Sequence, residues 1–186
     1  MGAIKSKKKY LILHGDSGAG KTLFLYNLKS SINTFGDIEP TEGFNYEEVS
    51  ISNNDYGIFD LSGDPSQYQL IDVITKFVDI VGVIFFFRME SIQNLEKSKN
   101  LLKLILDNQY LSNISLFILY NRRGQDTDKY GWITQDLLNK KINLDDLKKN
   151  YGLRFVGSEF WDCAVCYNRF DDNILKKLEG FASSLA

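Results

Sequence analysis

The segment GDSGAGKT, residues 15 to 22, constrains this chain more than any other. It matches G-x-x-x-x-G-K-[ST], a pattern in which glycines let successive backbone N–H groups wrap a phosphate. The apolar run YLILH precedes it, and the helical pattern LFLYNL follows it and would turn its positive end towards the anion. The sequence therefore predicts a strand, a phosphate-binding P-loop and a helix in succession. The expected phosphate contacts come from Asp16, Ser17, Gly18, Ala19, Gly20, Lys21 and Thr22, with Thr22 also able to ligate Mg²⁺.

The rest of the chain alternates between apolar strands and amphipathic helices. Strands are expected at 10–14, 44–51, 56–60, 81–87, 115–120 and 154–158, and helices at 21–31, 66–78, 91–109, 134–150 and 171–184. This alternation predicts an α/β fold with a mostly parallel six-stranded sheet and helices on both faces. The turn SNND joins the second and third strands and is too short for a crossover, so that pair must form an antiparallel hairpin.

Composition limits the class of protein. With 186 residues, 44% of them hydrophobic, residues 1–186 are expected to form a single domain with a short basic tail at 1–9. The net charge of −2 gives no general case for nucleic-acid binding. The most apolar run, at 80–87, is too short to cross a bilayer, and no secretory signal is recognised, so an intracellular location is expected. Cys163 and Cys166 have only His14 as a further soft ligand, which argues against zinc.

Several ordered segments, taken together, resemble the ADP-ribosylation factor (ARF) and ARF-like family of small GTPases over nearly the whole length. They are GDSGAGKT, PTEGFNYEEV, FDLSGD, VGVIFFF, LYNRRGQD and DCA at 162–164. The resemblance implies a small-GTPase fold that binds GTP or GDP with Mg²⁺. Thr41, in the loop before the hairpin, would be a second Mg²⁺ ligand, ordered when a γ-phosphate is present. Asp60 would complete the metal shell with Thr22 and Thr41.

The segment FDLSGDP at 59–65 departs from the family pattern Asp-x-Gly-Gly-Gln. Gly63 would still donate its N–H to the γ-phosphate. Asp64, however, stands at the position of the catalytic glutamine, where a neutral side chain with a donor and an acceptor must orient water. An ionised aspartate only accepts hydrogen bonds and is repelled by phosphate. We therefore expect intrinsic GTP hydrolysis to be weak or absent.

The base-recognition loop also departs from the family's Asn-Lys-x-Asp. Asn121 is in place, Arg122 replaces the lysine and can stack on a purine, and Gly124 stands where the acid is expected. Loss of that acceptor weakens the discrimination of guanine against adenine. The candidate base contacts are Asn121, Arg122, Asp126, Cys163 and Ala164, the last through its backbone N–H to the guanine carbonyl.

The N-terminus carries a candidate membrane anchor. MGAIKS matches M-G-x-x-x-[ST], so Gly2 is a candidate for N-myristoylation, and Lys5, Lys7, Lys8 and Lys9 follow it. One acyl chain binds membranes only marginally, and a basic cluster adds attraction to anionic lipid. The alternative is a plain start followed by solvating lysines, and the sequence favours neither. The location is thus cytoplasmic or peripherally membrane-associated.

Three functions remain open. The first is a guanine-nucleotide switch that recruits protein effectors through residues 38–75, where Phe44, Tyr56 and Phe59 offer an aromatic surface. The second is a degenerate GTPase that holds nucleotide permanently as a structural or adaptor subunit of a larger assembly. The third is a P-loop enzyme acting on adenine nucleotides, although neither an Arg-rich lid nor a base for an acceptor is evident.

Overall fold

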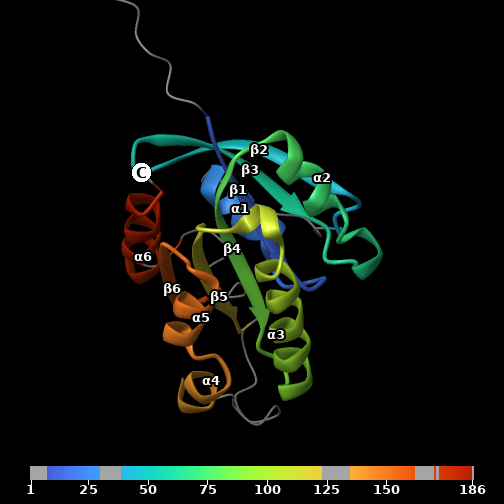
Figure 1. The fold of residues 1–186 in the computed structure, drawn as a ribbon, viewed down its shortest axis with the longest axis vertical. Coiled ribbons are helices and arrows are strands. Elements are labelled where there is room, and N and C mark those ends of the chain that lie inside the picture. Colours follow the sequence, from blue (N-terminus) through green and yellow to red (C-terminus); the bar gives the residue numbers. More distant parts are fainter. Residues whose placement is uncertain (1–7, 30–38, 123–134, 162–169, 171, 186) are drawn as a thin grey trace, which may run out of the picture.

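The computed structural model describes residues 8–29, 39–122, 135–161, 170 and 172–185. One six-stranded sheet runs through this part of the chain in the order β2-β3-β1-β4-β5-β6 (Figure 1). Its strands are β1 (Lys9–Gly15), β2 (Phe44–Ile51), β3 (Asn54–Leu61), β4 (Ile80–Arg88), β5 (Ser115–Asn121) and β6 (Phe155–Trp161). The α-helices are α1 (Lys21–Lys29), α2 (Leu70–Phe77), α3 (Ile92–Leu106), α4 (Gln135–Lys141), α5 (Leu144–Tyr151) and α6 (Asp172–Ser183), with 3₁₀ turns η1 (Pro65–Gln67) and η2 (Gln109–Leu111).

The directions of the strands are those predicted from the sequence. β2 and β3 pair antiparallel, whereas β1, β3, β4, β5 and β6 run parallel to one another. Ser52 and Asn53 close the hairpin with positive φ angles of 50° and 65°, the geometry of a two-residue turn that matches strand twist. The expected mostly parallel sheet with one antiparallel hairpin is confirmed.

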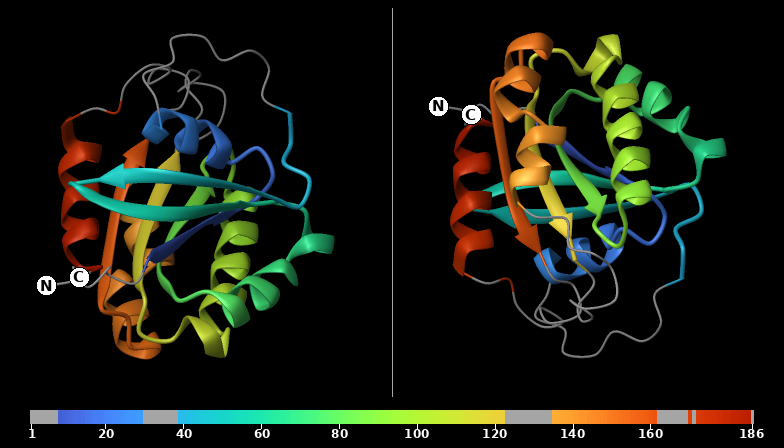
Figure 2. Two further views of the ribbon diagram at one scale, coloured as in Figure 1. Left: turned by 90° about the horizontal axis from the view of Figure 1, so that it is seen from above. Right: turned by 90° about the horizontal axis from the view of Figure 1, so that it is seen from below.

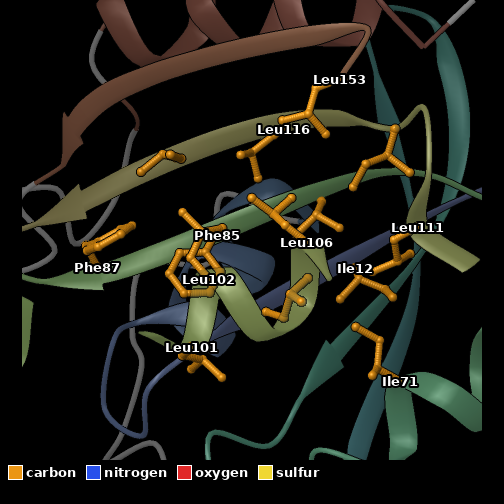
Figure 3. Packing of buried hydrophobic residues seen from close by; sticks show 14 of the residues in the cluster. Ile12, Ile71, Phe85, Phe87, Leu101, Leu102, Leu106, Leu111, Leu116 and Leu153 are labelled. Atoms are coloured by element: carbon orange, nitrogen blue, oxygen red, sulfur yellow. The ribbon is translucent and has the colours of Figure 1, made fainter. Parts of the chain in front are cut away.

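Side chains alternate between two cores, one on each face of the sheet. Phe85 and Phe87 of β4 and Ile12 of β1 face helices α2, α3, α4 and α5. Figure 3 shows Leu102 and Leu106 of α3 packed in the core on this face of the sheet. The neighbouring residues Leu11, Leu13, Ile84 and Phe86 face α1 and α6. Because successive strand residues point to opposite faces, apolar residues at every position of the central strands require helices on both sides.

Two helix predictions were wrong in detail. The helix expected over 134–150 is two helices, α4 and α5, because the Asn143 side chain accepts from Asp146 N and begins a new helix. The helix expected over 66–78 starts as η1, with Pro65 at its first position, and becomes α-helical only at Leu70.

The parallel arrangement brings the functional loops together. The carboxyl ends of β1, β3, β4, β5 and β6 lie along one edge of the sheet, and antiparallel β2 begins at that same edge. Ligands of open α/β sheets bind outside the carboxyl ends of the strands. Figure 2 shows this arrangement in two further views, in which α3 and α6 lie on opposite sides of the sheet. Among the described helices, none combines the length and the apolar character that a membrane span requires.

Candidate functional site

Neighbouring strands shape the P-loop between β1 and α1. Gly20 has a φ of +92°, and a Cβ there would lie 2.6 Å from Asn121 Nδ2 and 2.9 Å from the Trp161 ring. Gly15, with a φ of +148°, lies against the carbonyl of Phe86 in β4. Only glycine satisfies both the backbone angle and the lack of space at these two positions. Residues near the carboxyl ends of β4, β5 and β6 therefore pack directly against the P-loop glycines.

Lys21 folds over the loop that precedes it. Its Nζ donates to the carbonyls of Gly15 and Asp16, both at 3.0 Å. Burial lowers the pKa of Lys21, and the negative charges of Asp60 and Asp16 partly oppose this effect. A buried cation whose present acceptors are only neutral carbonyls is well suited to meet a phosphate, since an anion binds it more strongly.

Three oxygen-bearing side chains converge beside the lysine. Thr22 Oγ1 donates to Asp60 Oδ2 at 2.6 Å and lies 3.0 Å from Thr41 Oγ1, which in turn lies 3.5 Å from Asp60 Oδ2. Asp60 is fully buried, and its Oδ1 has no hydrogen-bond partner among the described residues. Burial is the main cause of a raised Asp60 pKa. The first turn of α1, the loop before β2 and the carboxyl end of β3 thus bring together the residues that the sequence proposed for the metal shell.

Hard oxygen ligands around an orphaned buried carboxylate oxygen fit Mg²⁺. That ion takes one or two protein oxygens and completes its octahedron with water and substrate phosphates. Within the described segments, no three His, Cys, Asp or Glu side chains gather as a metal site. The Thr22, Thr41 and Asp60 group therefore suits an ion shared with a phosphate better than an all-protein cage.

The loop after β3 uses its two key residues differently. Gly63 lies directly on the backbone of Asp16 and Ser17, where a Cβ would collide with Ser17 N. The Asp64 side chain accepts from Ser66 N at 2.9 Å and caps η1. This backbone hydrogen bond is the main cause of a lowered Asp64 pKa, so the side chain stays ionised. Gly63 is thus placed at the P-loop, while Asp64 has a local structural task.

Gln67 is a contact that sequence reasoning missed. Its Oε1 accepts from Gly43 N at 2.6 Å, and Gly43 O accepts from Ser62 N at 2.9 Å. These bonds tie the Thr41 loop to the segment after β3. The only sequence signal was a glutamine three residues beyond the position at which the family carries one.

The base side of the site is partly described. Asn121 is fully buried, and its Nδ2 donates to Ala19 O at 2.8 Å, which joins β5 to the P-loop. Arg122 N donates to Trp161 O at 2.9 Å, and its guanidinium lies 3.9 Å from the ring centre of Phe160. Arg122 therefore stacks on an aromatic ring of the protein. The other candidate base contacts, Asp126, Cys163 and Ala164, lie outside the described residues.

A second missed feature supports the first turn of the P-loop. The Asp16 side chain, 4% exposed, accepts through Oδ1 from Lys97 Nζ of α3 at 2.8 Å and from Ser17 N at 2.9 Å. Arg88 Nη1 donates to Ser17 O at 3.1 Å, and Arg88 also pairs with Glu90. No motif connects Lys97 to the loop, because the two are 81 positions apart.

The aromatic surface differs in one member from the expectation. Phe44 is 45% exposed and Tyr46 is 38% exposed, and both rings contact Phe59, with centroid distances of 5.7 and 5.1 Å. Tyr56, by contrast, is buried in the core, because alternation along β3 points it to the opposite face from Phe59. The aromatic cluster therefore consists of the exposed Phe44 and Tyr46 packed on the half-buried Phe59.

Comparison with known proteins agrees with this geometry. A family model described as the ADP-ribosylation factor family matches residues 1–181. ADP-ribosylation factor-like protein 1 of Saccharomyces cerevisiae is 28% identical over 77% of this chain and 74% of its own length. An ADP-ribosylation factor-like protein of Dictyostelium discoideum is 27% identical over 91% and 87%.

A solved structure confirms the fold. The Arl6 BBS3 small GTPase from Trypanosoma brucei, determined with the bound nucleotide analogue GppNp, superposes with a TM-score of 0.74. The match covers 96% of this chain and 98% of that one, at 15% identity. The family match, which spans nearly the whole chain, and the shared fold lead to one conclusion: this chain belongs to the ADP-ribosylation factor family of small GTPases.

Proposed function

We propose that this protein binds a guanine nucleotide together with Mg²⁺ and acts as a nucleotide-dependent switch with weak intrinsic hydrolysis. The observation that carries the proposal is the convergence of Thr22, Thr41 and Asp60 beside the P-loop, with Asp60 Oδ1 left without a partner in the described part of the chain. Bound Mg²⁺ would neutralise charge on the β- and γ-phosphates. Thr22 and Thr41 supply hydroxyl oxygens, and Asp60 supplies the buried carboxylate.

The P-loop contributes the phosphate contacts. The backbone from Asp16 to Thr22 wraps the anion, and α1 begins at Lys21, so its positive end faces the same place. Lys21 leaves the carbonyls of Gly15 and Asp16 and meets the phosphate. Gly63 lies against the P-loop backbone, and the proposal assigns its N–H to the γ-phosphate. In this proposal, the positions of Thr41 and Gly63 are the ones that depend on whether a γ-phosphate is bound.

Weak hydrolysis follows from what Asp64 does. Its carboxylate caps η1 and stays ionised, so it offers water no donor and carries a charge that phosphate repels. The test is a single-turnover GTP assay on the purified protein and on Asp64→Gln. We expect very slow hydrolysis by the wild type and a faster reaction by the variant. Rapid hydrolysis by the wild type that Asp64→Ala abolishes would show instead that Asp64 is catalytic.

The nucleotide itself is identified by denaturing protein purified without added nucleotide and separating what is released. Stoichiometric guanine nucleotide supports the proposal, and Lys21→Met is the matched variant that should release little. Adenine nucleotide would favour the P-loop enzyme alternative. The absence of any nucleotide would contradict the proposed function.

We further propose that effectors dock on the aromatic cluster of Phe44, Tyr46 and Phe59, in which Phe44 and Tyr46 are exposed. Phe44 and Tyr46 lie on β2, which begins three residues after Thr41, and Tyr46 contacts Phe59 of β3. Ordering of the Thr41 loop by nucleotide would therefore affect the position of the cluster. Exposed aromatic side chains are typical anchors of protein interfaces. Capture of a partner by the triphosphate form but not the diphosphate form, lost in Phe44→Ser, supports a switch.

A constitutively loaded adaptor subunit is the second candidate, and the capping role of Asp64 favours it. The two functions differ in whether nucleotide exchanges. An adaptor should keep its nucleotide for hours and bind its assembly regardless of the nucleotide state. A switch should exchange nucleotide and change its partners.

Membrane attachment through Gly2 and the lysines that follow it is a further proposal. Gly2, Lys5 and Lys7 lie outside the described residues. Lys8 pairs with Glu48, and Lys9 Nζ donates to Leu185 O at 2.6 Å, so these two lysines have contacts within the protein. Myristoylated protein should sediment with anionic vesicles, and Gly2→Ala should not.

A further inference from the structure

The second residue of the P-loop is an acid, and its position creates an electrostatic conflict. Asp16 belongs to the loop that must receive an anionic phosphate, and its side chain is 4% exposed. Its negative charge lies beside the phosphate-binding lysine, because Lys21 Nζ donates to the Asp16 carbonyl at 3.0 Å. An uncompensated buried carboxylate in this place would both repel phosphate and attract Lys21 away from it.

The structure shows how this conflict is resolved. Lys97 Nζ, on α3, lies 2.8 Å from Asp16 Oδ1, and the same oxygen accepts from Ser17 N at 2.9 Å. The carbonyl of Ser17 accepts from Arg88 Nη1 at 3.1 Å. Both polar groups of the Ser17 backbone are therefore bonded, and the carboxylate beside them is neutralised by a cation from a different element.

We propose that Lys97 is a positioning residue for nucleotide binding. It neutralises Asp16, so that the first turn of the P-loop can accept a phosphate and Lys21 remains available to the anion. The proposal rests on the proposed nucleotide-binding function and adds to it a residue outside every nucleotide-binding motif of the sequence. Lys97 acts through Asp16, and Asp16 is the only loop side chain with which it is paired in the described structure.

The consequence is a specific pattern of coupling. Lys97→Met removes the compensating charge and should speed the dissociation of fluorescent GDP by about tenfold, a moderate loss because Lys97 is itself 56% exposed. Lys97→Arg retains the charge and should remain near the wild type. In an Asp16→Asn background there is no carboxylate to neutralise, so Lys97→Met should have little effect there.

The experiment measures the dissociation of fluorescent GDP and of a fluorescent non-hydrolysable GTP analogue from the full chain. The variants are the wild type, Lys97→Met, Lys97→Arg, Asp16→Asn and the double variant. Lys103→Met is the matched control, since Lys103 is another exposed lysine of α3. Thermal unfolding of each variant separates a loss of binding from a loss of stability.

Loss in Lys97→Met with recovery in Lys97→Arg and in the double variant supports the proposal. Equal dissociation from Lys97→Met and the wild type overturns it while leaving nucleotide binding intact. A loss of the same size in the Asp16→Asn background also overturns it, because Lys97 would then act on the nucleotide directly. If Lys97→Met does not fold, Lys97→Gln takes its place, because it also removes the charge: dissociation at the wild-type rate overturns the proposal, and faster dissociation supports it. A wild type without nucleotide contradicts the proposed function itself.

Discussion

The stability of the protein should depend on pH through its single histidine. His14 is buried at the end of β1, where its Nδ1 accepts from Gly15 N at 2.7 Å and its ring contacts Tyr68 and Phe85. Burial, with a smaller contribution from the charge of Lys21, lowers the pKa of His14 from 6.5 to about 3. The folded protein therefore holds a neutral imidazole, and protonation would remove the acceptor for Gly15.

The size of the effect follows from linkage. Between the two pKa values the unfolded chain binds a proton at His14 and the folded protein does not, so stability rises with pH in this window and falls on acidification. At about pH 5, roughly 1.5 units below the unfolded value, the unfolded state gains about 2 kcal/mol relative to about pH 7. Because the folded-state group is uncharged at both pH values, this loss depends mainly on the unfolded pKa.

The assay compares urea unfolding of the wild type and His14→Asn at the two pH values. Asparagine can still accept from Gly15 N through Oδ1 but does not titrate. Its loss of ring packing is the same at both pH values, and carboxylates titrate alike in both proteins. The wild type should therefore lose about 2 kcal/mol more than the variant on acidification. Equal losses would refute the reasoning, because the folded protein would then have to accept a charge at residue 14.

Other parts of the site give simpler predictions. Gly20→Ala should cost at least about 2 kcal/mol in urea unfolding, because of its φ and its approach to Asn121. Gly180→Ala, in open space within α6, is its control and should stabilise by about 0.5–1 kcal/mol. Asn121→Ala leaves the Ala19 carbonyl without its side-chain donor and should cost about 1–3 kcal/mol together with faster nucleotide release, measured by the same assays. Chelation of Mg²⁺ by EDTA should accelerate the release of bound nucleotide, followed by fluorescence, and an unchanged rate would argue against the Thr22, Thr41 and Asp60 metal site.

Much of the fold could be predicted from short-range pattern. The period of the apolar residues located all six strands, and the short SNND connection required the hairpin to be antiparallel. Pattern failed where a single side chain changed the local structure. The amphipathic stretch 134–150 reads as one helix, but the cap made by Asn143 divides it.

The candidate site divides in the same way. Lys21 and Thr22 follow from a contiguous motif, and Asp60 and Gly63 follow from a resemblance in FDLSGDP. The cap that Asp64 gives to η1 could be checked only with the backbone in place, although both partners lie within three residues. The contact from Gln67 to Gly43 needed two loops to meet, and no pattern within either loop predicts it.

The sequence alone determined the P-loop, the order of the six strands along the chain and the family, because each depends on short segments of sequence or on the alternation of apolar side chains. Tertiary structure decided the electrostatics. Asp16 and Lys97 are 81 positions apart in the chain. They meet because the parallel strands all end at one edge of the sheet, so the loop after β1 and the helix after β4 begin side by side there. The same packing buries Asp60 and His14 and moves their pKa values in directions that residue identity does not specify. Charge compensation at the P-loop is thus a property of the folded arrangement, since burial and distance set its strength.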